Sequence, residues 1–234
     1  MKGRKNIAVL TILSLGMFLA SYAPAFAASD MTNAQAIVDR ARITLSDFMH
    51  DPNYDWFHKN LDRAKGVLIF PQVLKGAFIV GAAGGTGVFL VRDEKTGEWS
   101  QPAFYTIGEG SFGLQIGGEA TQVVMLAMTQ KAIDSLFSSS FKLGANASVA
   151  AGPMGTGATA SMSVPNVTAD FLSFAKSKGL YAGLDFTGAV IAVRDSLNSV
   201  YYGKNVTPPD IVERNMVSNE GSAELRESLR QAAA

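Results

Sequence analysis

The chain has 234 residues, with 20 basic and 20 acidic side chains, a formal net charge of zero and no cysteine. The lack of cysteine excludes disulfide bonds, a thiolate nucleophile and a cysteine-bound metal. The balanced charge argues against a nucleic-acid partner, because proteins that bind nucleic acid normally carry a strong positive excess.

The first 27 residues have the three parts of a secretory signal peptide. Lys2, Arg4 and Lys5 form a basic region, residues 7–20 are apolar and uncharged, and Ala25-Phe26-Ala27 is a small-x-small cleavage site. The apolar stretch is short for a hydrocarbon core of ~30 Å, so a signal peptide is favoured over a membrane-spanning helix. Cleavage after Ala27 would leave a mature chain with 17 basic and 20 acidic residues. We expect this mature chain to have no transmembrane helix and to be exported to the periplasm or envelope.

Two helices are predicted next. Thr32-Asn-Ala-Gln35 has the form of a capping box, and apolar residues recur behind it every three to four positions, so we expect a helix over 32–49. A shorter helix over 54–65 would end at Gly66 as its C-cap. The first helix could lie on a membrane, but its modest apolar face favours packing on the sheet of its own domain.

The block from Gly66 to Gly203 contains 20 of the 23 glycines, separated by short apolar runs. These runs predict buried or half-buried strands. The strands are expected at 67–70, 77–80, 88–92, 99–107, 120–128, 171–175, 180–186 and 189–193. Residues 93–98 would connect two of them as a hairpin, and Thr129 would cap a short helix.

Residues 141–164 predict a hairpin of small side chains. Leu143, Ala145, Ala147 and Val149 alternate with polar residues or glycine, and a turn at 152–157 precedes a returning strand over 158–164. Small side chains let another backbone or a ligand approach closely.

Helices are predicted at the end of the block and after it. Asp195 is expected to cap a helix that ends at Gly203, and Thr207-Pro208 to begin another. Residues 213–234 would form a polar helical tail, broken at Gly221. The whole predicts an α+β domain over 28–212, a curled or closed antiparallel sheet of eight or more short strands with N- and C-terminal helices.

The sequence contains motifs that resemble those of enzymes, but the other residues that each enzyme class needs are missing. Residues 108–113 match the glycine loop of protein kinases, but the lysine strand and catalytic loop are missing, so a glycine kink in a curved strand is the better interpretation. Residues 81–87 suggest a phosphate cradle without its Lys-Ser/Thr pair, and we expect a bulged turn there. His50 and His58 lack metal-ligand spacing. We therefore predict no enzyme, no catalytic residue, no metal and no cofactor.

Cations in the block sit at predicted strand ends or turns, where they could meet lipid phosphates. They are Lys75, Arg92, Lys142, Lys176, Lys178 and Arg194. Together they predict a weak positive rim, and each alone could equally be an ordinary solvated charge.

An ordered series of short motifs gives a more specific indication. It comprises residues 64–70, 75–78, 85–88, 99–102, 113–118, 143–146, 151–155 and 178–183. Their order and spacing over 33–212 resemble the SYLF domain, also called the Ysc84 family. The resemblance implies a non-enzymatic lipid-binding module, whose eukaryotic members are associated with phosphoinositides and some fungal members with actin.

Our first hypothesis is therefore a phospholipid-binding protein of a Gram-negative cell envelope, in which the small-residue strands hold acyl chains and basic side chains meet the head group. Actin is an unlikely partner for an exported protein. The alternative is an envelope scaffold or assembly protein that uses the same surface for a protein partner or a homo-oligomer. A hydrolase is the third possibility, without a convincing base near a nucleophile.

Overall fold

The computed structural model describes residues 23–77, 80–112, 117–152, 169–177 and 186–234. The helices are α2 (Ala23–Met49), η1 (Pro52–Tyr54), α3 (Asp55–Leu61), α4 (Gln130–Leu136), α5 (Asp195–Tyr202), α6 (Pro208–Val212), η2 (Glu220–Ser222) and α7 (Ala223–Ala232). The strands are β1 (Gly66–Ala77), β2 (Val80–Val91), β3 (Ala103–Phe112), β4 (Gly117–Ala127), β5 (Ser140–Lys142), β6 (Val149–Ala151), β7 (Phe171–Ser177) and β8 (Val190–Val193).

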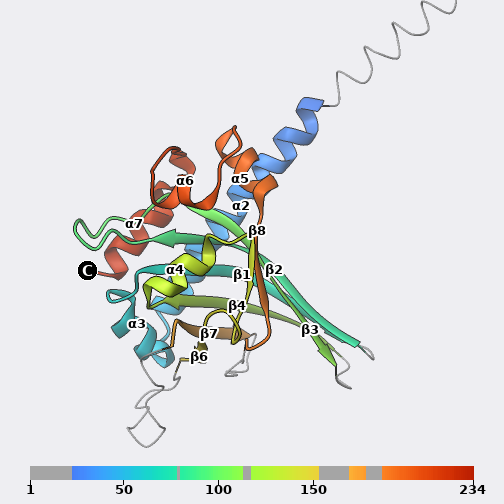
Figure 1. Cartoon of the computed structure of the whole chain (residues 1–234), viewed down its shortest axis with the longest axis vertical. Helices are drawn as coiled ribbons and strands as arrows, with labels where there is room; N and C mark the ends of the chain where they lie inside the picture. The colour runs from blue at the N-terminus through green and yellow to red at the C-terminus, as the bar shows by residue number, and fades with distance from the viewer. Residues whose placement is uncertain (1–22, 78–79, 113–116, 153–168, 178–185) are drawn as a thin grey trace, which may run out of the picture.

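The eight strands form one curled sheet in the order β5-β8-β3-β2-β1-β4-β7-β6, which confirms the predicted α+β class (Figure 1). Every pair along the sheet is antiparallel except β6 and β7, which are parallel. The sheet is therefore mixed, where the sequence predicted a purely antiparallel one. Among the described residues, no helix combines the length and apolarity that are needed to cross a bilayer.

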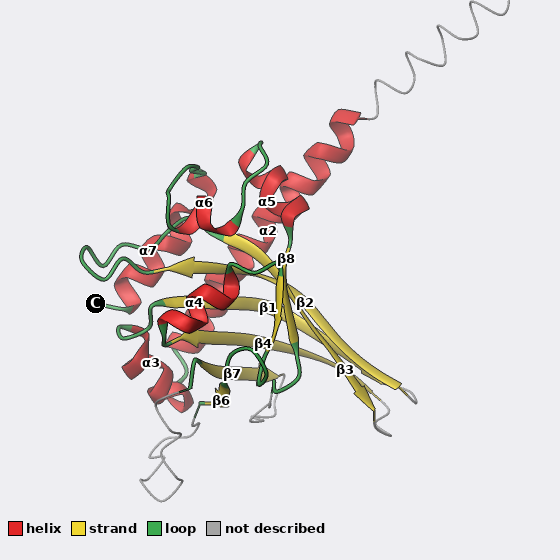
Figure 2. Ribbon diagram, in the orientation of Figure 1, coloured by secondary structure: helices red, strands yellow, loops and turns green. Residues whose placement is uncertain are grey.

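Helices cover both faces of the sheet (Figure 2). We call the face under α2, α3, α5 and α7 the outer face, and the face under α4 and α6 the inner face. Alternate residues of β1 serve the two layers: Val67 and Ile69 belong to the outer core, and Leu68 and Phe70 to the inner core. Burial on both faces explains why the central strands are continuous apolar runs in the sequence.

A β-bulge interrupts this alternation in β1. Ile69 pairs with Val88 and Gln72 with Thr86, so β1 has one residue more than β2 over this stretch, and the same holds against β4. Pro71 lies in the bulge, where its missing N–H removes no regular ladder bond. After the bulge Val73 joins the inner core. Gln72 and Leu74 consequently fall on the outer face.

The two N-terminal helices differ from their predictions. The first begins at Ala23 rather than Thr32, because Pro24 is tolerated in the first turn and the alanine-rich residues after it continue the helix. The second ends at Leu61, with Asp62 as its C-cap. Gly66 instead begins β1, where a Cβ atom would lie 2.8 Å from the Phe89 ring and 2.9 Å from the Leu90 carbonyl oxygen.

The glycine run over 81–87 is the interior of β2 and not the predicted turn. Of the predicted strand over 77–80, Ala77 ends β1 and Val80 begins β2, and residues 78–79 lie outside the described residues. Glycine is required in part of the run by close backbone approach: a Cβ atom at Gly85 would lie 2.3 Å from the Gln72 oxygen, and one at Gly87 would lie 2.2 Å from the Ile69 oxygen. The kinase-like residues 108–112 likewise lie in β3.

The predicted strand over 141–149 is also wrong. Strand β5 ends at Lys142, and a turn follows in which Gly144 has a φ of +81° and the Lys142 N–H donates to Asn146 Oδ1 over 2.9 Å. The chain then forms β6, parallel to β7. The predicted turn and returning strand, over 153–164, lie outside the described residues, as does most of the strand expected at 180–186.

Several predicted helix starts and ends are confirmed. The Thr129 side chain accepts from the Ala132 N–H at the start of α4, and Thr207 forms a capping box with Asp210 at the start of α6. Gly203 ends α5 with a φ of +68°, and η2 interrupts the C-terminal helical segment at Gly221. Asp195 is the first residue of α5 and not its cap, which is Arg194.

Candidate functional site

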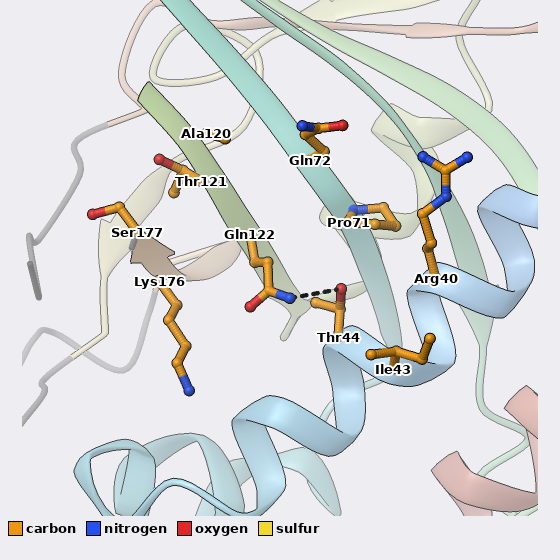
Figure 3. A pocket seen from close by; sticks show the side chains of 10 residues that line it. All are labelled: Arg40, Ile43, Thr44, Pro71, Gln72, Ala120, Thr121, Gln122, Lys176 and Ser177. Carbon is orange, nitrogen blue, oxygen red and sulfur yellow. Dashed lines mark hydrogen bonds between the residues drawn. The ribbon is translucent and has the colours of Figure 1, made fainter. Parts of the chain in front are cut away.

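A groove of about 410 Å³ lies on the outer face, where α2 crosses β1, β4 and β7 (Figure 3). Its lining residues are Arg40, Ile43, Thr44, Pro71, Gln72, Ala120, Thr121, Gln122, Lys176 and Ser177. They come from four segments that are far apart in the sequence. Helix α2 forms one wall, and the sheet forms the floor.

The β1 bulge creates the apolar part of this region. Because it moves Leu74 to the outer face, this side chain is 55% exposed, and Ile43 on α2 is 51% exposed. Leu74 pairs with Ala120 on one side and with Gly84 on the other. The exposed apolar surface thus continues from the groove along the sheet.

Glycines keep the neighbouring outer face smooth. Gly84 pairs with Gly108, and a Cβ atom at Gly108 would meet nothing within 4 Å. At Gly84 the nearest atom would be the Ile107 oxygen, at 3.7 Å. Sterics therefore do not require glycine at either position, in contrast to Gly85 and Gly87. Glycine at such a strand position leaves room for a ligand or another backbone.

Hydrogen bonds fix the polar wall of the groove. Gln122 Nε2 donates to Asp47 Oδ2 over 2.8 Å and to Thr44 Oγ1 over 3.5 Å. Lys176 Nζ lies 2.9 Å from Asp51 Oδ2. Burial alone would raise the pKa of Asp51, but hydrogen bonds from Lys176 and Asn53 outweigh it and hold the pKa below its ordinary value. Asp51 is thus held in its ionised form, and the carboxylates of Asp47 and Asp51 already have hydrogen-bond partners in Gln122 and Lys176.

The two cations of the groove differ in availability. The Lys176 ammonium points away from Gln72, toward α2, while Arg40 lies on the opposite side of the groove (Figure 3). Arg40 is exposed, and its Nε donates to the Ala36 oxygen over 3.1 Å. Among the described residues, no carboxylate forms an ion pair with Arg40. The Arg40 guanidinium is the open cation, whereas Lys176 contributes mainly its methylene stem.

The predicted basic rim is not one site. Among the members whose side chains the structure describes, Lys176 lines the groove. Arg92 lies at the other end of the sheet, where its Nη1 donates to the Asp62 oxygen over 2.6 Å. Lys142 is exposed on the edge strand β5.

Two of the other three members lie in described segments of the backbone. Arg194 precedes α5, and its N–H donates to the Phe104 oxygen. Lys75 lies in β1, in register with Glu119, and Lys178 lies outside the described residues. Their binding role stays a prediction.

Sequence reasoning missed Arg40, Ile43, Gln72 and Gln122. Arg40 falls outside the apolar positions that recur along the predicted helix over 32–49, so the helical pattern gives it no role. One local signal was available: a proline within an apolar strand indicates a bulge, and a bulge at Pro71 reverses the faces of the residues after it.

The histidines have structural contacts. His50 Nδ1 lies 2.8 Å from the Ser46 oxygen, and His58 Nε2 lies 2.9 Å from the Phe48 oxygen. The part of the chain that the structure describes contains no group of three His, Cys, Asp or Glu residues that could hold a metal ion.

A family model described as "Ysc84: Las17-binding protein actin regulator" matches residues 108–232, which is more than half of the chain. The chain belongs to the Ysc84 family. The match runs from within β3 to the end of α7 and includes the β4 and β7 sides of the groove.

Proteins of yeast and of mammals share part of this sequence. It is 39% identical over 150 residues to LAS seventeen-binding protein 3 of Saccharomyces cerevisiae, covering 63% of this chain and 32% of that protein. It is 30% identical over 168 residues to SH3 domain-containing YSC84-like protein 1 of Bos taurus, covering 71% of this chain and 48% of that protein. The chain thus spans a third to a half of these relatives. No solved structure matches it.

The names of the family and of these relatives refer to Las17 binding and actin regulation. They give no support to the expectation that actin is an unlikely partner.

Proposed function

We propose that this protein binds phospholipid without catalysing a reaction, and that the groove beside α2 is its binding site. The observation that carries this proposal is a groove lined by exposed Ile43 and the open cation Arg40, with exposed Leu74 paired to the lining residue Ala120 on the same sheet. A phospholipid has the matching chemistry, an apolar chain joined to a phosphate.

The energetics favour a lipid over a small polar ligand. Each acyl methylene that is buried contributes about 0.8 kcal/mol, so six methylenes against Ile43, Leu74 and the glycine surface would contribute roughly 5 kcal/mol. The smooth sheet surface at Gly84 and Gly108, which neighbours the groove, leaves room for a chain to lie along the strands. This proposal keeps the predicted small-residue surface but replaces the six-cation rim with the groove.

The test is native mass spectrometry for co-purified phospholipid, combined with flotation of the protein with anionic vesicles. Ala120→Trp would fill the groove from β4, and Ala145→Trp at an exposed turn is its matched control. We expect lipid and flotation with the unmodified protein and with A145W, and loss of both with A120W. Unmodified protein that carries no lipid and does not float would contradict the proposal.

We further propose that residues 1–27 direct export and are removed, which places the protein in the periplasm or envelope. The three-part pattern of this segment supports the proposal. N-terminal sequencing of protein from its native cells tests it. We expect Ala28 as the first residue, and a chain that still begins at Met1 in the cytoplasm would contradict export.

The second candidate is a protein-binding scaffold, and the Las17-binding and actin-regulator names of the family favour it. The same groove would then hold a protein segment. Light scattering on the purified protein and co-sedimentation with actin filaments test this candidate. A stable assembly or actin binding, together with no lipid, would favour the scaffold over the lipid-binding function.

A further inference from the structure

We propose that the groove selects a phospholipid whose head group carries a single negative charge and hydroxyl groups, and that Arg40 is the residue that binds its phosphate. This inference rests on the proposed lipid-binding function and assigns the head group. Phosphatidylglycerol is the simplest lipid of this class.

The charges around the groove determine how many phosphates it can bind. Its lining contains two cations and no carboxylate. Lys176 is neutralised by Asp51 at 2.9 Å, which leaves Arg40 as the open cation among the described residues. One guanidinium matches one phosphate, with which it forms two parallel hydrogen bonds.

Head groups with other charges fit less well. Several phosphates would place uncompensated negative charge near Asp47 and Asp51, whose carboxylates already accept hydrogen bonds from Gln122 and Lys176. A choline or ethanolamine head group would bring an ammonium beside Arg40 and would find no free carboxylate in the lining. Phosphates repel the nearby carboxylates, and an ammonium repels the Arg40 guanidinium. Head groups with several phosphates and head groups with an ammonium are therefore both disfavoured.

Neutral polar groups on the floor favour hydroxyls. Gln72 is exposed at the groove, and Gln122 uses its Nε2 for Asp47 and Thr44, which leaves its Oε1 to accept. Amides both donate and accept, as hydroxyl groups do. A hydroxylated head group could therefore be bound on the floor while its phosphate contacts Arg40.

The experiment compares vesicles of phosphatidylcholine that contain phosphatidylglycerol with vesicles that contain a phosphatidylinositol bisphosphate at equal total charge. Arg40→Gln removes the cation, and Arg40→Lys keeps the charge without the guanidinium fork. Arg42→Gln is the matched control, because Arg42 pairs with Glu224 of α7 at 3.2 Å, away from the groove lining. Unchanged thermal unfolding checks that each variant is folded.

We expect R40Q to bind phosphatidylglycerol vesicles at least about tenfold more weakly, because a charged hydrogen-bonded contact is lost. R40K should lose less, and R42Q should stay within about twofold, as an exposed ion pair contributes little. The bisphosphate vesicles should bind no more tightly than the phosphatidylglycerol vesicles.

Four results would overturn the inference. Equal vesicle binding by R40Q and R42Q would remove Arg40 from the site while the lipid-binding function stands. An Arg40-dependent preference for the bisphosphate would refute the single-charge selectivity. Binding of soluble glycerol phosphate as tight as vesicle binding would show that the ligand is no lipid. Unmodified protein that binds no vesicle contradicts the proposed function and the inference together.

Discussion

Ser148 and Asp170 hold each other through three hydrogen bonds of 2.8 Å. The Ser148 N–H and Oγ both donate to Asp170 Oδ2, and the Asp170 N–H donates to Ser148 Oγ. Thr129 Oγ1 adds a bond of 2.7 Å to Asp170 Oδ1, and Lys131 Nζ lies 3.2 Å from Oδ2. Asp170, which is 6% exposed, lies just before β7. Its carboxylate thus links β7 to the start of α4 and to the residue that precedes β6.

Asp170→Ala should lower the free energy of unfolding by about 3 kcal/mol, because it leaves the Thr129 and Ser148 donors without their acceptor. Urea denaturation at neutral pH measures the loss. The matched control is Asp134→Ala on α4, an exposed carboxylate that accepts from Gln130. D134A should change stability by no more than about 0.5 kcal/mol. Equal losses in the two variants would contradict a special role for Asp170.

The same carboxylate makes stability depend on pH. Burial opposes its ionisation, but the hydrogen bonds from Thr129 and Ser148 outweigh burial and lower the pKa of Asp170 from 3.8 to about 2. A lowered folded-state pKa stabilises the protein above the unfolded-state value. That stability, about 2 kcal/mol, is lost as the pH falls from about 4 through 2.

Asp170→Asn isolates this effect from other acidic groups, such as Asp210 and Glu227, whose pKa values also lie at about 2. The difference in unfolding free energy between the unmodified protein and D170N should shrink by about 2 kcal/mol between pH 5 and pH 2. Urea titrations at a series of pH values measure it. A constant difference would show that Asp170 does not titrate as described.

Two glycines of the sheet should respond in opposite ways to the same substitution. Gly87→Ala places a Cβ atom 2.2 Å from the Ile69 oxygen and 2.6 Å from the Phe70 ring, so we expect a loss of at least about 2 kcal/mol. Gly108→Ala meets no atom within 4 Å and should be neutral, or more stable by about 0.5 kcal/mol, since it restricts the unfolded chain. Thermal unfolding of both variants decides this. A similar loss at Gly108 would mean that the strand needs glycine there for another reason.

The sequence predicted those features that depend on local chemistry. The cap at Thr129, the helix start at Thr207-Pro208 and the helix end at Gly203 each follow from a few neighbouring residues. The apolar runs likewise located the central strands, because residues buried on both faces form continuous apolar segments.

The groove could not be predicted in the same way, because no local pattern joins its walls. Arg40, Gln72, Gln122 and Lys176 lie on four elements and meet only through the sheet order and the path of α2. The bulge at Pro71 decides which β1 residues face the groove, and simple alternation would have placed Gln72 on the inner face. Of the six predicted cations, Lys176 is placed in the groove lining, but its ammonium is paired with Asp51, and its binding role stays a prediction.

Lys176→Met tests whether Lys176 contributes to lipid binding through its methylene stem or through its charge. Methionine keeps an unbranched stem in the lining but leaves Asp51 without its ion-pair partner, so stability should fall by about 1 kcal/mol. If Arg40 is the cation that binds the lipid phosphate, vesicle binding of K176M should stay within about twofold of the unmodified protein. Urea denaturation and vesicle flotation, run on the same preparation, measure the two effects. A loss of vesicle binding as large as that of R40Q, with K176M still folded, would mean that Lys176 leaves Asp51 to contact the lipid and that the groove offers two cations.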